Sequence, residues 1–326
     1  MISISHSPPS ILSRIPELAC PECRQQLKET PEALICPCGR TFPFDGAICD
    51  MLVENGEFVE EIEVQDRVAD CYLNLRHEQP YSRQYHDWWT DEMLRRVRTS
   101  GRILDNGCGI GLLNGKAPAN NVVCLDISSE MLRHAGRHFD QLVRGNSQQL
   151  PFQDSSFDLC FARSLLHHLP DPQQGIDEMY RVLRPGGELV LTDTQTSALS
   201  FLPRALAYRG EHFSAAHKNL SAGALRRILH PYFHVDEVAY FGYVAYPLLG
   251  FPEQLKLFRF APFKTASAKG LMAVDRFLAR IPFVRTQSWG VLIKATRRNL
   301  VQQYRVSRPD AAANRRQTRA VAEACR

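Results

Sequence analysis

The stretch Arg102-Ile-Leu-Asp-Asn-Gly-Cys-Gly-Ile-Gly111 reads as an apolar strand that runs into a tight turn. The turn has the pattern Asp105-x-Gly107-x-Gly109-x-Gly111. Because glycine lacks a Cβ and tolerates positive φ, such a turn lets ligand atoms approach the main-chain amides closely. The stretch therefore predicts the first strand and turn of an α/β fold, with a nucleoside-type ligand above the turn.

The spacing of the glycines distinguishes a dinucleotide site from a site for another nucleoside-type ligand. A dinucleotide site uses Gly-x-Gly-x-x-Gly and places a pyrophosphate at a helix start, whereas here the glycines alternate and Asp105 precedes them. That carboxylate would repel a pyrophosphate but suits a cationic amino group. About 20 residues on, Asn121-Val-Val-Cys-Leu-Asp126 reads as a second strand that ends in an acceptor for two ribose hydroxyls. Together the two carboxylates predict S-adenosylmethionine (AdoMet).

Further segments follow this loop in a familiar order, and with them residues from about 80 to 195 resemble the class I, type 11 methyltransferases. That broad group includes the quinone-ring methylases. The segments are Leu104–Gly111, Cys124-Leu-Asp126, Gly145-Asn-Ser-Gln-Gln-Leu-Pro-Phe152, Ser156-Phe-Asp-Leu-Cys-Phe-Ala-Arg-Ser-Leu-Leu-His-His-Leu169 and Tyr180-Arg-Val-Leu-Arg-Pro-Gly-Gly-Glu-Leu-Val-Leu191. The resemblance implies an AdoMet-dependent methyltransferase.

The resemblance also implies which residues bind the cofactor. Asn146 and Ser147 fall where the adenine lies, with asparagine in place of the more usual aspartate; its amide still offers a donor and an acceptor. Arg163, where the family has a small residue, falls at a strand end where methionine and acceptor meet. Tyr85 either donates to the methionine carboxylate or packs on the sheet. The full expected set is Tyr85, Asp105, Gly107, Gly109, Gly111, Asp126, Ile127, Asn146, Ser147 and Arg163.

Strands and helices alternate along the rest of the chain, which predicts a doubly wound, seven-stranded Rossmann-like sheet with helices on both faces. About 45 residues separate the last two predicted strands, so a helical insertion is expected there. Within it, Leu271, Val274, Leu278 and Ile281 recur at helical spacing. The expected parts are a zinc-ribbon-like module at 16–53, an acidic linker and helix at 54–79, the methyltransferase domain at 80–305 with its insertion at about 243–286, and a disordered tail at 306–326.

Four cysteines near the N-terminus form two pairs, Cys20-Pro-Glu-Cys23 and Cys36-Pro-Cys38. Four thiolates in two tight turns suit a tetrahedral Zn²⁺, and the metal would supply folding energy that so short a segment lacks. The second pair has one intervening residue in place of two, so a metal-free module is the alternative. The module resembles small zinc units fused to some methyltransferases, including those that modify guanine in ribosomal RNA.

Composition and charge limit the kinds of partner that the protein is expected to have. The 326 residues carry 39 basic and 35 acidic side chains, a net charge of +4, which gives no broad electrostatic footprint for nucleic acid. No secretory signal opens the chain, and its most apolar run, Tyr240–Phe251, is too short to cross a bilayer. We therefore expect a cytoplasmic protein. The apolar and basic insertion suits either a cover over an acceptor pocket or a peripheral membrane contact.

His167 and His168 follow the fourth predicted strand and are candidate bases, because an imidazole titrates near neutral pH. A base is required only if the acceptor loses a proton. Three functions remain open. The first is methyl transfer to a small, fairly apolar acceptor such as a quinone-like ring, a lipid or a secondary metabolite. The second is methylation of an RNA base with help from the cysteine module. The third is AdoMet binding without catalysis.

Overall fold

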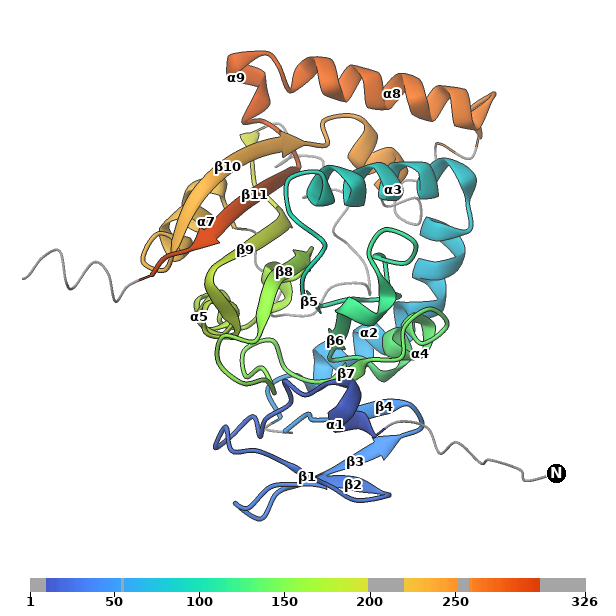
Figure 1. Cartoon of the computed structure of the whole chain (residues 1–326). Helices are drawn as coiled ribbons and strands as arrows, with labels where there is room; N and C mark the ends of the chain where they lie inside the picture. Colours follow the sequence, from blue (N-terminus) through green and yellow to red (C-terminus); the bar gives the residue numbers. More distant parts are fainter. Residues whose placement is uncertain (1–9, 54–55, 199–219, 251–257, 259, 300–326) are drawn as a thin grey trace, which may run out of the picture.

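The computed structural model describes residues 10–53, 56–198, 220–250, 258 and 260–299 (Figure 1). Its centre is a sheet in the order β7-β6-β5-β8-β9-β11-β10. The first five of these strands run parallel, and β11 is antiparallel to both β9 and β10. The strands are β5 (Ile103–Asn106), β6 (Val122–Asp126), β7 (Leu142–Arg144), β8 (Phe157–Arg163), β9 (Leu183–Thr194), β10 (Phe233–Phe241) and β11 (Gly290–Arg297). The Rossmann-like α/β fold predicted from the sequence is confirmed.

Apolar side chains alternate between the two faces of this sheet. Leu104 of β5 and Val123 of β6 belong to one buried cluster, whereas their neighbours Ile103 and Val122 belong to another. Strands with both faces buried are expected when helices cover a parallel sheet on either side. The covering helices include α3 (Pro80–Leu94), α4 (Ser129–Ala135), α5 (Pro172–Val182) and α7 (Ala222–Leu229).

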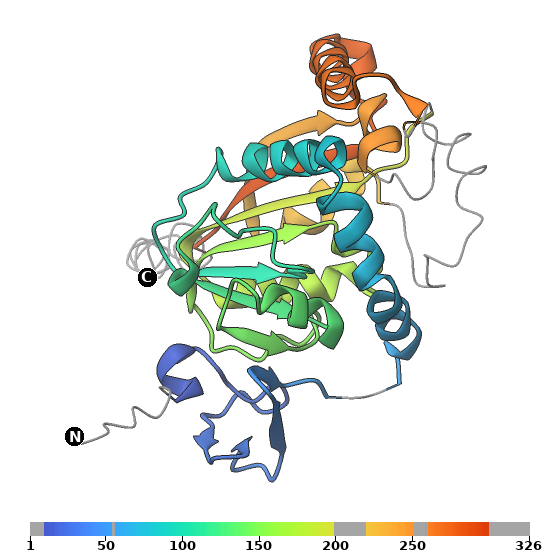
Figure 2. The ribbon, with the colours of Figure 1, turned by 90° about the vertical axis from the view of Figure 1, so that its right-hand side faces the viewer.

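The N-terminal module that carries the four cysteines is part of the central sheet and not a separate unit. Its four strands are β1 (Lys28–Glu29), β2 (Ala33–Ile35), β3 (Thr41–Asp45) and β4 (Ile48–Asp50), preceded by the short helix α1 (Ile11–Arg14). Strand β4 pairs in parallel with β7, so the module continues the central sheet (Figures 1 and 2). Ile15 and Leu34 share one buried cluster with Val143 and Phe152. The module and the main domain therefore have a common core.

Residues 56–79 lead from the module to the main domain as two consecutive helical segments. Helix α2 (Val59–Cys71) passes directly into the π-helical segment η1 (Tyr72–His77), which ends just before α3. Figure 2 shows α2 and η1 one after the other along one side of the sheet. The expected linker and helix at 54–79 is thus mainly helical and borders the pocket described below.

The insertion between β10 and β11 contains η4 (Tyr246–Gly250), α8 (Lys264–Leu278) and α9 (Pro282–Arg285). Helix α8 lies across the outside of α3 (Figures 1 and 2). Its buried residues are Ala268, Met272 and Asp275, whereas Val274 is 45% exposed, so the apolar face predicted through Val274 does not face the core. Asp275 determines how α8 is rotated about its own axis, because its carboxylate accepts hydrogen bonds from the backbone amides of residues 243–245.

No helix among the described residues is both long enough and apolar enough to cross a membrane. The expected tail at 306–326 lies outside the described residues.

Candidate active site

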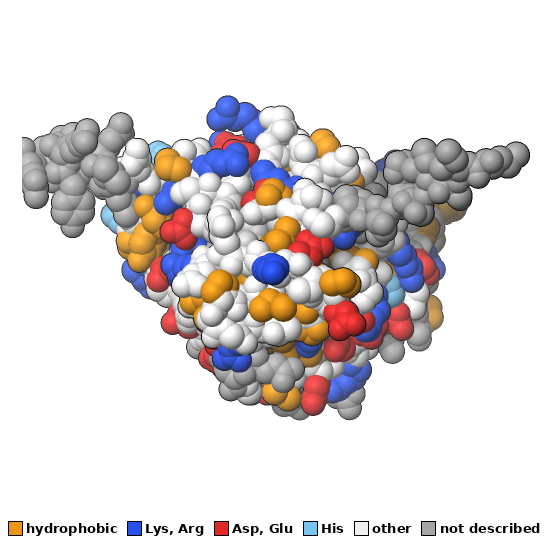
Figure 3. Space-filling model, turned by 60° about the horizontal axis from the view of Figure 1, so that its bottom comes forward, with side chains coloured by type: hydrophobic (Ala, Val, Ile, Leu, Met, Phe, Trp, Pro, Cys, Tyr) orange, Lys and Arg blue, Asp and Glu red, His pale blue; other side chains and the backbone are white. Residues whose placement is uncertain are grey.

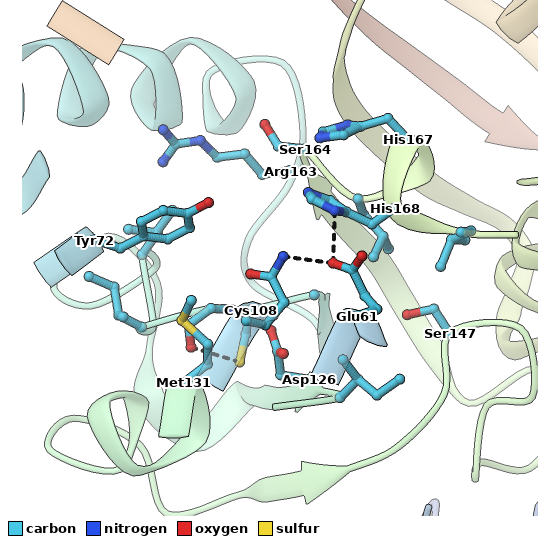
Figure 4. A pocket seen from close by; sticks show the side chains of 18 of the residues that line it. Glu61, Tyr72, Cys108, Asp126, Met131, Ser147, Arg163, Ser164, His167 and His168 are labelled. Atoms are coloured by element: carbon cyan, nitrogen blue, oxygen red, sulfur yellow. Dashed lines mark hydrogen bonds and ion pairs between the residues drawn. The ribbon is translucent and has the colours of Figure 1, made fainter. Parts of the chain in front are cut away.

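A pocket opens where β5, β6 and β8 end at their carboxyl edge, and α2 and η1 form its opposite wall (Figure 4). This is the edge at which open α/β sheets bind ligands, because loops diverge there to either face. The predicted residues that line the pocket are Gly107, Gly109, Asp126, Ile127, Asn146, Ser147, Arg163, His167 and His168. Asp105, Gly111 and Tyr85 do not line it.

The glycine loop has the conformation that its sequence requires. Gly107 and Gly109 have φ of 73° and 53°, and a Cβ on Gly107 would lie 2.9 Å from Leu165. The backbone amide of Gly109 donates a hydrogen bond to Asp126 Oδ2 at 2.8 Å, and Ser128 donates to Oδ1 at 3.0 Å. Asp126 therefore holds the loop and still borders the pocket, as a ribose ligand must. Gly111 instead packs behind the loop, against Phe139.

Asp105 lies buried at the end of β5, directly before the glycine loop, with 2% of its surface exposed. Its Oδ2 atom has no hydrogen-bond partner among the described residues. Burial raises the pKa of Asp105 to about 8, and the nearby Asp126 carboxylate adds to this rise. A cationic group beside Asp105 would relieve both effects, which is the behaviour expected of a residue beneath an ammonium group.

Asn146 and Ser147 follow β7 and border the other end of the pocket. The Asn146 side-chain oxygen accepts from the backbone amide of Gln148 at 2.8 Å, and the Ser147 hydroxyl donates to Asn106 at 2.8 Å. These bonds fix both side chains at the pocket, which Ile127, the residue after the predicted ribose ligand, also lines. Their place fits the adenine end of the ligand.

Arg163 is a buried cation in contact with aromatic and neutral groups, and the charge of Arg76 acts on it as well. Its guanidinium donates to Thr90 at 3.1 Å and to His86 Nδ1, and it stacks on the Trp89 ring at 4.2 Å. None of the described carboxylates forms an ion pair with it, and burial lowers its pKa to about 9. Burial together with the Arg163 charge keeps the pKa of His86 well below its usual value, so this histidine is neutral and can accept the bond. Arg163 projects into the pocket (Figure 4).

Tyr85 is placed differently from the cofactor role expected of it. It is fully buried within the second cluster, and its hydroxyl has no partner among the described residues. Its ring packs against Trp88, Trp89 and Tyr246. Helix α3 turns Tyr85 toward the insertion, and it is Trp89, one turn further on, that reaches the pocket. Of the two roles that the sequence left open for Tyr85, its position fits packing in the core.

The two histidines at the pocket each have a carboxylate partner. His167 Nδ1 contacts Asp193 at the end of β9, and burial lowers the pKa of His167 despite that carboxylate. His168 Nδ1 lies 2.9 Å from a carboxylate oxygen of Glu61 on α2, which is within ion-pair distance (Figure 4). The imidazole ring is not oriented for a hydrogen bond to that oxygen. Glu61 is 5% exposed and also accepts from Gln65 at 2.7 Å. His168 is the more accessible of the two histidines, with 21% of its side chain exposed against 6%.

Sequence reasoning missed the wall formed by α2 and η1. This wall supplies Phe58, Glu61, Gln65, Tyr72, Arg76 and His77 to the pocket. These residues precede the segments that carry the resemblance and contain no motif, and the acidic run that includes Glu61 predicted only a linker passing into a helix. The sequence did contain one signal for this wall. At a helical period, Glu61, Gln65 and Tyr72 lie on one face.

The four N-terminal cysteines converge at the tip of the module. The Sγ atoms of Cys20, Cys23, Cys36 and Cys38 all lie within 4.8 Å of one another. Cys20 and Cys38 are 3.8 Å apart, and Cys23 and Cys36 are 3.3 Å apart. Sulfurs that share a tetrahedral zinc at about 2.3 Å are about 3.8 Å apart, so the arrangement fits the metal. Cys49 lies instead in the shared core and is fully buried.

Comparison with known proteins identifies the centre of the chain. Residues 104–191 match the family model described as "Methyltransferase domain". A demethylmenaquinone methyltransferase of Listeria welshimeri is 37% identical over 123 residues, which cover 33% of this chain and 52% of the relative. A malonyl-[acyl-carrier protein] O-methyltransferase of Erwinia billingiae is 35% identical over 112 residues, covering 33% and 45%. The chain thus spans about half the length of the curated relatives it matches.

Among solved structures, a chain from the complex of the Haloferax volcanii Trm112 methyltransferase activator with a methyltransferase aligns with a TM-score of 0.50. The two chains are 20% identical, and the alignment covers 73% of this chain and 97% of the other. At that identity the likeness concerns the fold alone. Together the comparisons confirm an AdoMet-dependent methyltransferase domain over residues 104–191.

Proposed function

We propose that this chain, whose residues 104–191 form a methyltransferase domain, transfers the methyl group of AdoMet to a small, fairly apolar acceptor. The observation that carries the proposal is the pair of buried carboxylates on either side of the glycine loop. Asp126 borders the pocket beside Gly109, and Asp105 lies directly before the loop with one oxygen that has no partner in the described part of the chain. One suits two ribose hydroxyls and the other an ammonium group.

When bound, AdoMet supplies an electrophilic methyl group on a sulfonium. The chain's own residues then have mainly a positioning task, because methyl transfer is an in-line displacement that depends on orientation. Asp126, Ile127, Asn146 and Ser147 would hold the nucleoside, with Gly107 and Gly109 beneath it. Asp105 and Arg163 would hold the amino and carboxylate ends of the methionine part.

Apolar residues of the pocket wall support a small, fairly apolar substrate. Phe58, Tyr72, Trp89, Leu165 and Leu169 contribute aromatic or aliphatic surface to the pocket, which the polar residues Glu61, Arg76 and His77 also line. The name of one relative, a demethylmenaquinone methyltransferase, agrees with such an acceptor. The other is named for a malonyl group on a carrier protein, which is neither small nor apolar. His168 would take a proton from an acceptor that must lose one, with Glu61 stabilising the resulting imidazolium.

An RNA base is the second candidate acceptor, and it requires a basic surface that joins the cysteine module to the pocket. On the face shown in Figure 3, the coloured Lys and Arg side chains are interspersed with Asp and Glu. This mixture argues against a phosphate-tracking surface on that face, since such surfaces concentrate one sign of charge. A pocket that binds AdoMet without catalysis is the third candidate.

Isothermal titration calorimetry with AdoMet tests the cofactor assignment. We expect the native chain to bind, and Asp126→Ala to bind about 30-fold more weakly, because a charged acceptor of two hydroxyls contributes about 2 kcal/mol. Asp154→Ala, an exposed carboxylate away from the pocket, is the matched control. No heat from the native chain at millimolar AdoMet would refute the assignment.

A transfer assay with tritium-labelled AdoMet identifies the acceptor class. The acceptors to compare are reduced quinones, a lipid extract and ribosomal RNA. We expect label in the quinone or lipid fraction. Label in RNA would select the second candidate, and AdoMet binding without any transfer would select the third.

We further propose that Cys20, Cys23, Cys36 and Cys38 bind a structural zinc ion. Metal analysis of the purified chain is expected to find one zinc per molecule, and Cys23→Ser to lose most of it. Cys49→Ser, outside the cluster, is expected to retain the metal. A zinc-free native chain that keeps its fold would contradict the proposal.

A further inference from the structure

Helix α8 exposes an apolar stripe on the side that faces away from the protein. Phe263, Val274 and Phe277 are 87%, 45% and 62% exposed, and Phe283 on the adjoining α9 is 90% exposed. Residues 270, 274 and 277 recur at intervals of four and three, which places them on one side of the helix, and Phe263 caps its N-terminal end with a left-handed backbone conformation. Ala268, Met272 and Asp275 occupy the opposite, buried side.

We call Phe263, Val274, Phe277 and Phe283 the outer stripe. The other exposed residues in its sector of α8 are Ala266, Gly270 and Ala273, which are small and uncharged. No charged side chain therefore interrupts the stripe along the whole helix, whose residues are all described. Exposed aromatic rings gathered in this way mark a binding surface rather than ordinary surface composition.

Basic residues border the outer stripe. Between residues 260 and 285 the basic side chains are Lys264, Lys269, Arg276, Arg280 and Arg285, all exposed, and the single acidic side chain is Asp275. Asp275 is 3% exposed and is occupied by three backbone amides, so it offers no negative charge to a partner. The segment thus presents five cations and no accessible anion, although the whole chain has a net charge of only +4.

From this arrangement we propose that α8 and α9 attach the protein to the surface of an anionic phospholipid bilayer. The Phe side chains of the outer stripe enter the boundary between headgroups and acyl chains, while the flanking Lys and Arg side chains contact lipid phosphates. Interfacial helices combine these two features, an apolar face and a basic border. The position of α8 on the outside of α3 leaves the stripe accessible (Figures 1 and 2).

The charge argues against a second copy as the occupant. A symmetric dimer through this surface would bring two sets of five cations together, and residues 260–285 offer no accessible anion to offset their repulsion. An anionic bilayer instead meets both requirements of the surface at once, and it needs no transmembrane helix.

Vesicle sedimentation with the full chain tests the proposal. We expect binding to vesicles of phosphatidylcholine and phosphatidylglycerol at 3:1, and at least tenfold weaker binding to phosphatidylcholine alone. Removal of two charges in Lys269→Gln/Arg276→Gln should weaken binding about 25-fold, since each basic residue contributes about fivefold. Phe277→Ser/Phe283→Ser should weaken it about tenfold or more, because the apolar insertion is lost.

Two matched variants serve as controls. Ile35→Ser/Val59→Ser removes exposed apolar side chains elsewhere, and Lys28→Gln/Arg137→Gln removes exposed charges elsewhere. Both should bind vesicles like the native chain, and all four variants should bind AdoMet equally. Absent binding to anionic vesicles, equal binding to neutral ones, or equal loss in the control variants would overturn the proposal. Self-association that only the Phe277→Ser/Phe283→Ser variant abolishes, without vesicle binding, would assign the surface to a second copy.

Discussion

Asp105 combines features that are costly in a protein without a bound cation. It is buried, it lies near a second carboxylate, and one of its oxygens lacks a partner among the described residues. Its pKa of about 8 means that a proton neutralises it at pH 7 while no ligand is bound. An ammonium group above it would favour the ionised form and displace that proton.

The affinity for S-adenosylhomocysteine should therefore increase with pH below 8. Ligand binding lowers the pKa of Asp105, so tight binding requires loss of the proton. From pH 6 to pH 7.5 the fraction of ionised carboxyl, and with it the affinity, rises about twentyfold for a pKa of about 8. Calorimetric titration measures this slope, which Asp105→Asn should abolish and Asp154→Asn should leave intact. A flat profile in the native chain would contradict the role of Asp105.

Arg163 is the second residue whose chemistry suggests an absent partner, because a buried guanidinium usually pairs with an anion. We expect Arg163→Met to weaken binding of S-adenosylhomocysteine about 30-fold, which corresponds to about 2 kcal/mol for a bond to a charged group. Methylthioadenosine lacks the amino acid part and should bind the variant and the native chain equally. Equal losses for both ligands would indicate a packing role among Trp89 and His86 instead.

At the scale of elements, α8 is joined to the rest of the fold by the buried carboxylate of Asp275 as well as by the apolar contacts of Ala268 and Met272. Asp275 accepts hydrogen bonds from the amides of Tyr243, Val244 and Ala245 at 3.0, 2.7 and 3.1 Å. These bonds join α8 to the segment before η4 and rotate the helix so that Val274 and Phe277 face outward. The rotation could not be read from the spacing of apolar residues, because a buried Asp normally counts as an exposed position.

Asp275→Ala should lower the free energy of unfolding by about 3 kcal/mol, because three buried amides lose a charged acceptor. Urea unfolding followed by circular dichroism measures the change. Asp70→Ala, whose side chain is 85% exposed, should change the stability by less than about 0.5 kcal/mol. A similarly small effect of Asp275→Ala would show that apolar packing alone holds α8.

At the scale of the whole molecule, the cysteine module extends the methyltransferase sheet. Strand β4 pairs with β7, and Met51 donates to the carbonyl of Arg144 at 2.8 Å. The chain then enters α2, which contributes Glu61 to the pocket. The module is therefore connected to the pocket wall by only a few residues of chain.

The shared core predicts that module and main domain unfold together. Differential scanning calorimetry of the native chain should show one transition, and Cys23→Ser should move that whole transition downward by about 5 °C or more, since loss of a structural metal removes folding energy. Cys49→Ser is a poor control here because Cys49 is buried, so Cys71→Ser, only half-buried on α2, is preferred. A separate low-temperature transition that alone responds would indicate an independent module.

The sequence by itself determined the Rossmann-like fold, the glycine loop with Asp105 and Asp126, and the convergence of the four N-terminal cysteines. Each of these depends on neighbours within a few residues or on a regular period, which the sequence displays directly. Only the tertiary structure placed α2 and η1 against the pocket, paired Glu61 with His168, enclosed Arg163, and turned Tyr85 away. These features depend on contacts between residues far apart in the chain, where a rotation of one helix by a single residue decides which side chain faces the site.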